Sequence, residues 1–145
     1  MTLDEIYEEW GKDVKIDRSD LGNESLKIPL LHHKWFKVFS VERKKHRILS
    51  GKLRDLEFRK KQFYEEGPTK ETQALGWRMP SRGKILPTSV KGYVEADPDV
   101  REMAEKVAEQ AEIVDVVENI IKSINGRGYL IKDIIQWNLF INGVK

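Results

Sequence analysis

The sequence predicts a mainly α-helical protein with a long basic helix and a C-terminal helical hairpin that associates with copies of itself. Apolar residues recur at steps of three and four over most of the chain, which is the period of an amphipathic helix. Between residues 30 and 64 there is no Pro and one Gly, Gly51. The last segment is apolar on more than one side, which favours burial between subunits.

Composition limits the possible classes of protein. The chain has 145 residues, no Cys and 34% charged residues, which suits one domain or two small lobes. Absence of Cys favours a reducing compartment, and without paired His at ligand spacing we expect no structural zinc. The acidic start, MTLDEIYEEW, is unlike a signal peptide, and no run of ~18 apolar residues predicts a membrane span.

The first two elements are predicted from capping and periodicity. Leu3–Gly11 reads as a short helix, with Thr2 and Glu5 as a capping box. A polar connector, residues 12–23, leads to a long helix with Pro29 in its first turn and its end at Tyr64. We expect residues 1–66 to form an N-terminal helical region, with 67–96 as a linker and 97–145 as a C-terminal helical oligomerisation region.

Charge is concentrated in the long helix. Residues 28–64 hold eleven basic and three acidic side chains, whereas residues 1–26 and 97–124 each hold three basic and eight acidic ones. Arg43, Arg47 and Arg54 recur at steps of four and seven and therefore share a helix face. This pattern indicates an anionic partner; the alternatives are a solvated face or packing against acidic segments of this chain or a neighbour.

The linker and the C-terminal region follow. Glu66–Lys84 is rich in Gly and Pro and reads as a linker or ordered loop, and the next segment allows one short strand around Gly92–Glu95. Asp97 is a predicted N-cap before Pro98, and Asn125-Gly126 is predicted to end that helix. Tyr129–Ile141 then forms the last helix, either in subunit contacts or as an intramolecular hairpin. The predicted oligomerisation residues are Val100, Met103, Val107, Val114, Val117, Ile121, Ile124, Ile131, Ile134 and Ile135.

Motifs for enzymatic chemistry are missing from the sequence. Gly83-Lys84 lacks the earlier Gly of a phosphate-binding loop, and no Ser sits in a nucleophile elbow. Asp97 and Asp99 could pair on a metal in a nuclease, but at a helix start they read as a cap. We therefore expect no enzyme activity and no cofactor.

Cations interleaved with aromatic residues are typical of single-stranded nucleic acid binding, since cations hold phosphates and rings stack on bases. Phe58, Phe63 and Tyr64 flank Arg59-Lys60-Lys61; of the three, Phe63 is expected to pack in the core. A membrane surface is the other anionic candidate, although the apolar residues it needs are better used as core. The predicted nucleic-acid-binding residues are Arg43, Lys44, Lys45, Arg47, Lys52, Arg54, Arg59, Lys60, Lys61 and Tyr64.

Five stretches of the sequence together match a known family: LDEIYEEWGKDVKID, HKWFKVFS, QFYEEG, VKGYVEADPDV and GRGYLIKDI. Through them the chain resembles the UvsY-type recombination mediator proteins of T-even-type bacteriophages, and residues 1–66, which hold the basic stretch, are then the expected DNA-binding region. The resemblance covers most of the chain. It implies a non-enzymatic ring-like homo-oligomer of six or seven subunits in the cytoplasm of the infected bacterial host. The implied partners are single-stranded DNA, the phage single-strand-binding protein and a RecA-like recombinase, which the protein helps to load during DNA recombination and repair.

The resemblance also points to particular positions. The family's basic motif, Leu-Lys-Ala-Arg-Leu before an aromatic pair, corresponds here to residues 57–61 before Phe63-Tyr64. Lys60 matches the motif's Arg, while Phe58 stands where the motif has Lys and is flanked by Arg59. The rival hypothesis is a structural scaffold that binds no DNA and whose basic helix pairs with acidic helices of neighbouring subunits.

Overall fold

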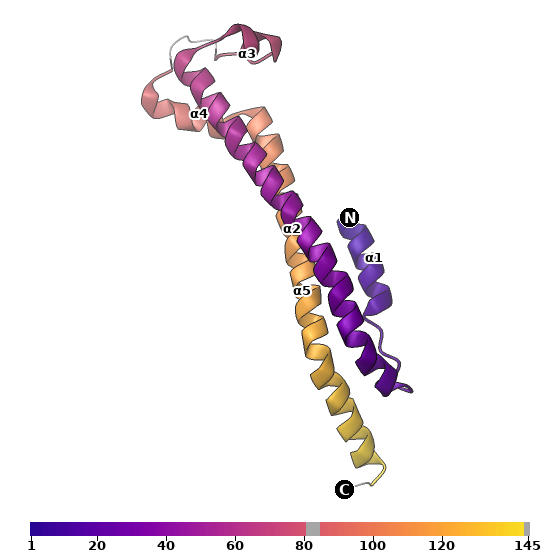
Figure 1. The fold of residues 1–145 in the computed structure, drawn as a ribbon. Helices are drawn as coiled ribbons and strands as arrows, with labels where there is room; N and C mark the ends of the chain where they lie inside the picture. Colours follow the sequence, from indigo (N-terminus) through magenta and orange to yellow (C-terminus); the bar gives the residue numbers. More distant parts are fainter. Residues whose placement is uncertain (81–84, 144–145) are drawn as a thin grey trace. The chain divides into compact units, whose positions relative to one another are not determined.

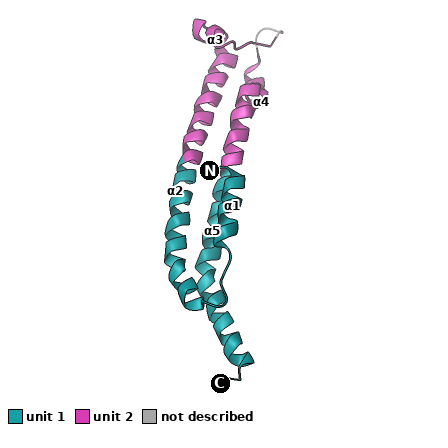
Figure 2. Ribbon diagram, turned by 90° about the vertical axis from the view of Figure 1, so that its right-hand side faces the viewer, with its two compact units in different colours: residues 1–44, 111–145 teal, residues 45–110 magenta. Residues whose placement is uncertain are grey.

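A computed structural model describes residues 1–80 and 85–143, and the described residues form helices and connecting segments without a strand. Figure 1 shows their order along the chain. The helices are α1 (Leu3–Asp13), α2 (Leu21–Glu66), α3 (Lys70–Ala74), the 3-10 helix η1 (Pro87–Ser89), α4 (Val90–Ala96) and α5 (Pro98–Ile141). The chain divides into two compact units, residues 1–44 with 111–145 and residues 45–110, so α2 and α5 contribute to both (Figure 2).

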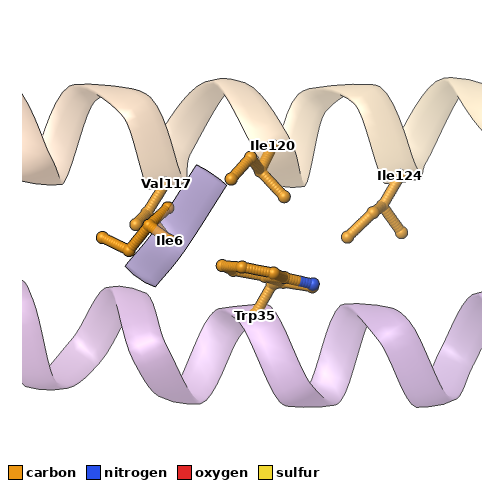
Figure 3. Packing of buried hydrophobic residues seen from close by; sticks show 5 residues of the cluster. All are labelled: Ile6, Trp35, Val117, Ile120 and Ile124. Atoms are coloured by element: carbon orange, nitrogen blue, oxygen red, sulfur yellow. The ribbon is translucent and has the colours of Figure 1, made fainter. Parts of the chain in front are cut away.

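Unit 1 is built around Trp35 of α2. Its buried core consists of Ile6, Trp35, Val117, Ile120 and Ile124. Figure 3 shows the Trp35 ring reaching from α2 toward Ile120 and Ile124 of α5, with Ile6 of α1 next to Val117. Three helices therefore share one small core, and burial of a large aromatic ring supplies much of its apolar area.

Polar contacts hold α1 in unit 1. Asp13 accepts hydrogen bonds from Lys34 Nζ at 2.6 Å and from Trp35 Nε1 at 2.9 Å. Burial alone would lower the pKa of Lys34, but hydrogen bonds to Asp13 and Glu9 outweigh it and raise the pKa above its ordinary value. The buried Arg127 donates to the backbone carbonyls of Asp13 and Val14, both at 2.8 Å, and so satisfies oxygens at the end of α1.

Unit 2 has a separate core. It consists of Phe63 and Tyr64 from α2, Val90 and Val94 from α4, and Val100 from α5. The ring centroids of Phe63 and Trp77 lie 5.6 Å apart in an edge-on arrangement, which ties the segment after α3 to the end of α2. α2 ends at Glu66, and the next residue, Gly67, has a φ of 89°, the left-handed conformation that Gly adopts readily after a helix.

The predicted helix starts are confirmed for α1 and α5. Thr2 and Glu5 form the capping box of α1. Asp97 Oδ1 accepts from the backbone N–H of Asp99 at 2.9 Å and from that of Val100 at 3.3 Å, so it caps α5 ahead of Pro98. The start of α2 was predicted too late, because the helix begins at Leu21 and Pro29 lies inside it.

Two other expectations were wrong. Gly92–Glu95 belongs to α4 and not to a strand, because Val90 and Val94 are one helical turn apart and both enter the core. The C-terminal hairpin does not form, because α5 continues through Asn125-Gly126 to Ile141 as one helix (Figure 1).

Most of the predicted oligomerisation residues are shielded from solvent within the single chain. Val100, Val117, Ile124 and Ile131 are buried. Five more are partly buried, and Ile135 is exposed. The partly buried residues are Met103, Val107, Val114, Ile121 and Ile134. The heptad seam of α5 is thus largely used within each unit, and most of it is already covered.

Within the described ranges, no helix combines the length and apolar character that crossing a membrane requires.

Candidate nucleic-acid interface

The predicted cations all lie on α2, and eight of the nine are exposed. Arg43 and Lys44 belong to unit 1, and the others belong to unit 2. The exposed cations are Arg43, Lys44, Lys45, Arg47, Lys52, Arg54, Arg59 and Lys61. Since α2 has only three carboxylates between residues 28 and 64, this stretch presents a concentrated positive field.

Most of these cations have no carboxylate partner in the part of the chain that is described. Seven of them take part in none of its ion pairs: Arg43, Lys44, Arg47, Lys52, Arg54, Arg59 and Lys61. Arg43 instead places its guanidinium 5.2 Å from the ring centroid of Phe39. Like charges on one helix repel unless anions or solvent offset them, so this stretch of α2 is suited to a polyanion.

The unit 2 part of α2 has two distinct faces. Arg47, Arg54 and Lys61 follow one another at seven-residue steps and are exposed, so they form a row along one face. Leu53 and Leu56 are partly buried and pack against the unit 2 core on another face. The core therefore fixes the rotation of the helix and leaves the cation row in solvent.

Lys60 behaves differently from its neighbours, because its residue is only 3% exposed. Its Nζ lies 2.9 Å from Asp99 Oδ2, 3.2 Å from Asp97 Oδ2 and 3.9 Å from the ring centroid of Trp77. We call Lys60, Tyr64, Trp77, Asp97 and Asp99 the Lys60 cluster. The sequence predicted that Lys60 contacts DNA, whereas the structure places its charge against two carboxylates inside unit 2.

Tyr64 belongs to the same cluster. Its hydroxyl donates to Asp97 Oδ2 at 2.5 Å, and burial together with that carboxylate raises the pKa of Tyr64. Burial alone would raise the pKa of Asp97, but hydrogen bonds from Tyr64 and Lys60 outweigh it, so the pKa lies below its usual value. Tyr64 is buried and its hydroxyl is bound to Asp97. It is therefore not among the exposed residues of α2, although the sequence predicted it as a nucleic-acid-binding residue.

The sequence carries a signal for the burial of Lys60 that the charge pattern alone hides. Leu49, Leu53, Leu56 and Phe63 form an apolar stripe along α2 whose last step is seven residues. Lys60 divides that last step into four and three, so it occupies a stripe position. A cation in such a position is buried and needs acidic partners, which Asp97 and Asp99 provide.

The aromatic residues divide in the same way. Phe63 packs in the unit 2 core, as predicted, and Tyr64 is buried beside it. Phe58 is 61% exposed and lies between Arg54 and Lys61 in the sequence of α2. Of the three predicted aromatics, Phe58 alone presents its ring to solvent.

The paired aspartates have structural roles. Asp97 caps α5 and accepts from Tyr64, and Asp99 pairs with Lys60. Within residues 1–80 and 85–143 no group of three His, Cys, Asp or Glu side chains is placed to hold a metal ion.

Comparison with known proteins gives a consistent result. The family model described as "Recombination, repair and ssDNA binding protein UvsY" matches residues 9–144. No match was found among curated proteins.

Crystal structures of the bacteriophage T4 recombination mediator protein UvsY share the fold. The lattice type IV structure gives a TM-score of 0.82 at 23% identity, covering 97% of this chain and 99% of the T4 chain. Lattice type II gives 0.82 at 22% identity, covering 98% of each chain. Lattice type I gives 0.79 at 22% identity, covering 94% and 98% respectively.

Proposed function

The chain belongs to the UvsY family of recombination, repair and single-stranded-DNA-binding proteins, and from this premise we propose that it is a recombination mediator that holds single-stranded DNA on the exposed cations of α2. In this role it helps a RecA-like recombinase to load onto strands covered by single-strand-binding protein. The observation that carries the proposal is the set of seven exposed α2 cations without a carboxylate partner among the described residues.

The cation row supports phosphate binding by geometry. Arg47, Arg54 and Lys61 lie about 10 Å apart along the helix axis at 1.5 Å per residue. This spacing lets each cation meet a different phosphate of an extended strand. The mechanism requires no fuel, because a strand held in a conformation that suits the recombinase better than the competing protein shifts occupancy by differential affinity alone.

Exposed apolar residues near the end of α5 support self-association. The Tyr129 residue is 75% exposed and Phe140 is 73% exposed, and Trp137 is also exposed. Trp137 and Phe140 stack with their ring centroids 5.7 Å apart, and exposed apolar side chains that gather in this way favour an interaction site. A homo-oligomer would cover these side chains and repeat the cation row in each subunit, so modest affinities per subunit would combine.

The test compares two triple variants with the same change in net charge. In the first variant Arg47, Arg54 and Lys61 become Ala. The control replaces Lys70, Lys106 and Lys122, which are exposed on other helices. Binding of a labelled oligothymidine is measured by fluorescence anisotropy over a series of salt concentrations, and the mass of each variant by light scattering.

We expect the first variant to bind more weakly and with a smaller salt dependence, since log K of single-strand binding falls about 0.7 per phosphate neutralised. The control variant should keep most of the DNA affinity and most of its salt dependence. Equal losses of affinity in the two variants would show that net charge, and not the position of the cations, determines binding. A wild-type protein that shows no affinity for DNA at physiological salt would favour the scaffold hypothesis, as would an assembly that breaks down when the α2 cations are removed.

A further inference from the structure

An exposed aromatic ring beside the cation row has no role in either core. Phe58 follows Arg54 by one turn of α2 and precedes Lys61 by nearly one turn, so the three side chains are neighbours on one surface. At 61% exposure its ring remains in contact with water. Its place beside Arg54 and Lys61, which take part in no ion pair of the described residues, puts the ring within reach of a ligand that those cations hold.

Phe58 lines a groove between α2 and α4 within unit 2. The groove has a volume of about 560 Å³, inside the range of about 300 to 1,000 Å³ found for small-molecule sites. Its lining includes Val90, Val94 and Val100, which belong to the unit 2 core. The core therefore fixes part of the lining, and the exposed ring of Phe58 adds to it.

The charges around the groove favour an uncharged occupant. Three glutamates line it, and Lys91 pairs with one of them, Glu95, at 4.0 Å, so a phosphate would gain little by entering. Arg54 and Lys61 also line the groove but take part in no ion pair of the described residues, so they remain available to phosphates that stay outside it. A nucleobase is uncharged, flat and apolar on its faces, and it stacks on an aromatic ring while its phosphates stay outside.

The cation row continues beyond the groove along α2. Arg47 is exposed and lies one seven-residue step before Arg54, outside the groove lining. A strand whose phosphates follow Arg47, Arg54 and Lys61 passes directly over Phe58. The same cations that hold the strand thus place one base of it at the groove.

We propose that Phe58 is a base-stacking platform, and that a base of single-stranded DNA enters the groove between α2 and α4 while Arg54 and Lys61 hold the flanking phosphates. The inference rests on the proposed function and adds to it an interaction with bases. Since every base has an aromatic face, this contact is tolerant of sequence.

The experiment uses two strands of equal phosphate number, an oligothymidine and an abasic strand of the same length. The full chain is compared with Phe58→Ala, Phe58→Trp and Leu75→Ala in fluorescence anisotropy at several salt concentrations. Leu75 is a matched control, because it is a 60% exposed apolar residue of unit 2 outside α2. Light scattering and far-UV circular dichroism of each variant report assembly and folding.

We expect Phe58→Ala to weaken oligothymidine binding by about five- to a hundredfold, the change that corresponds to about 1–3 kcal/mol per stacked base at 1.4 kcal/mol per tenfold. The salt slope and the affinity for the abasic strand should stay unchanged. Phe58→Trp should restore binding, and Leu75→Ala should have no effect.

Three results would overturn the inference. Binding of oligothymidine by Phe58→Ala within twofold of the wild type would show that the ring contributes nothing. Equal loss on both strands would show that Phe58 acts through packing, and a change in assembly mass would place it in a subunit contact. All three leave the proposed function standing, whereas a wild-type chain that binds neither strand refutes the proposed function itself.

Discussion

Two adjacent lysines are predicted to have opposite roles, and substitution of each by Met tests the structure directly. Lys60 is buried against Asp97 and Asp99, while Lys61 is exposed in the cation row and has no ion pair among the described residues. Met matches the length of the Lys side chain without its charge. Both variants therefore have the same composition and net charge, and they differ only in position.

The cost of Lys60→Met follows from its contacts. Removal of one partner of a buried ion pair costs about 3–5 kcal/mol. Asp97 keeps its hydrogen bonds from Tyr64 and from two backbone N–H groups, which places the loss at the lower end. The contact with Trp77 at 3.9 Å is also lost; a desolvated cation over a ring contributes about 2 kcal/mol, and a Met sulfur on the ring recovers about 1 kcal/mol.

We therefore expect Lys60→Met to lower the free energy of unfolding by about 3–4 kcal/mol, and Lys61→Met to change it by less than about 0.5 kcal/mol. Urea denaturation followed by circular dichroism measures both values. The protomer concentration is kept fixed, because self-association would make stability depend on it. In DNA binding the order reverses, and Lys61→Met should lower the salt slope by about 0.7 for the phosphate it no longer holds.

Equal stabilities of the two variants would refute the buried arrangement of Lys60. So would a Lys60→Met protein that is fully stable but has lost one phosphate contact, since that result would place the side chain in solvent. If Lys61→Met, and not Lys60→Met, caused the large loss of stability, the assignment of Lys60 to the buried face of α2 and of Lys61 to the exposed face would be refuted.

Three further predictions concern other parts of the chain. Burial would raise the pKa of Asp97, but hydrogen bonds from Tyr64 and Lys60 outweigh it and hold the pKa below its ordinary value. Its carboxylate therefore adds stability at neutral pH that disappears as the pH falls from the ordinary pKa of Asp through the native one, and urea titrations should show Asp97→Asn to be less stable by about 1.5–3 kcal/mol at pH 7, with the difference vanishing in acid. Arg127→Met should lower the free energy of opening of the α1 amides, measured by hydrogen exchange, by about 1.5–3 kcal/mol. The reason is that the two backbone carbonyls at the C-terminal end of α1 lose their charged donor. Trp137→Ser with Phe140→Ser should reduce the assembly mass in light scattering without unfolding the chain, since both side chains are exposed.

The helices were predictable from sequence where local signals agreed with the packing. The Thr2 and Glu5 box and the Asp97 cap are short-range hydrogen-bond patterns, and they form as expected. The start of α2 was missed because Pro29 suggested a first turn. Asp20 instead accepts from the side chain of Asn23 at 2.7 Å and from its backbone N–H at 3.4 Å, so a second capping signal lay upstream.

The predicted hairpin failed for a tertiary reason. Gly in a helix interior costs about 1 kcal/mol relative to Ala, and Asn125-Gly126 therefore predicts a helix end. However, Ile124, Arg127 and Ile131 recur at steps of three and four and are all buried in unit 1. Their burial offsets the free-energy cost of the glycines, so α5 continues as one helix. Rules that use only neighbouring residues in the sequence do not include this tertiary burial.

The candidate site was predictable as a segment and only partly as residues. Because charge density is a property of composition, the excess of Lys and Arg predicts a basic stretch, and the structure places it on α2 with most of its cations exposed. Which cations are free depends on the carboxylates that the fold brings near, and Asp97 lies 37 residues from Lys60 along the chain. That pairing required the packing of α2 against the start of α5 in unit 2.

Self-association and DNA binding are expected to be linked although different residues carry them. Seven exposed cations on one chain bound to seven phosphates would give a salt slope of at most about 5, at 0.7 per phosphate. Such binding weakens sharply as salt rises, so one chain alone would release the strand at moderate ionic strength. Copies joined through Trp137 and Phe140 would present several rows at high effective concentration, and avidity would retain the strand. The double Ser variant should therefore lose DNA affinity although neither residue touches DNA, while its slope per chain stays the same. A variant that no longer assembles but binds with wild-type affinity would show that a single α2 row is sufficient.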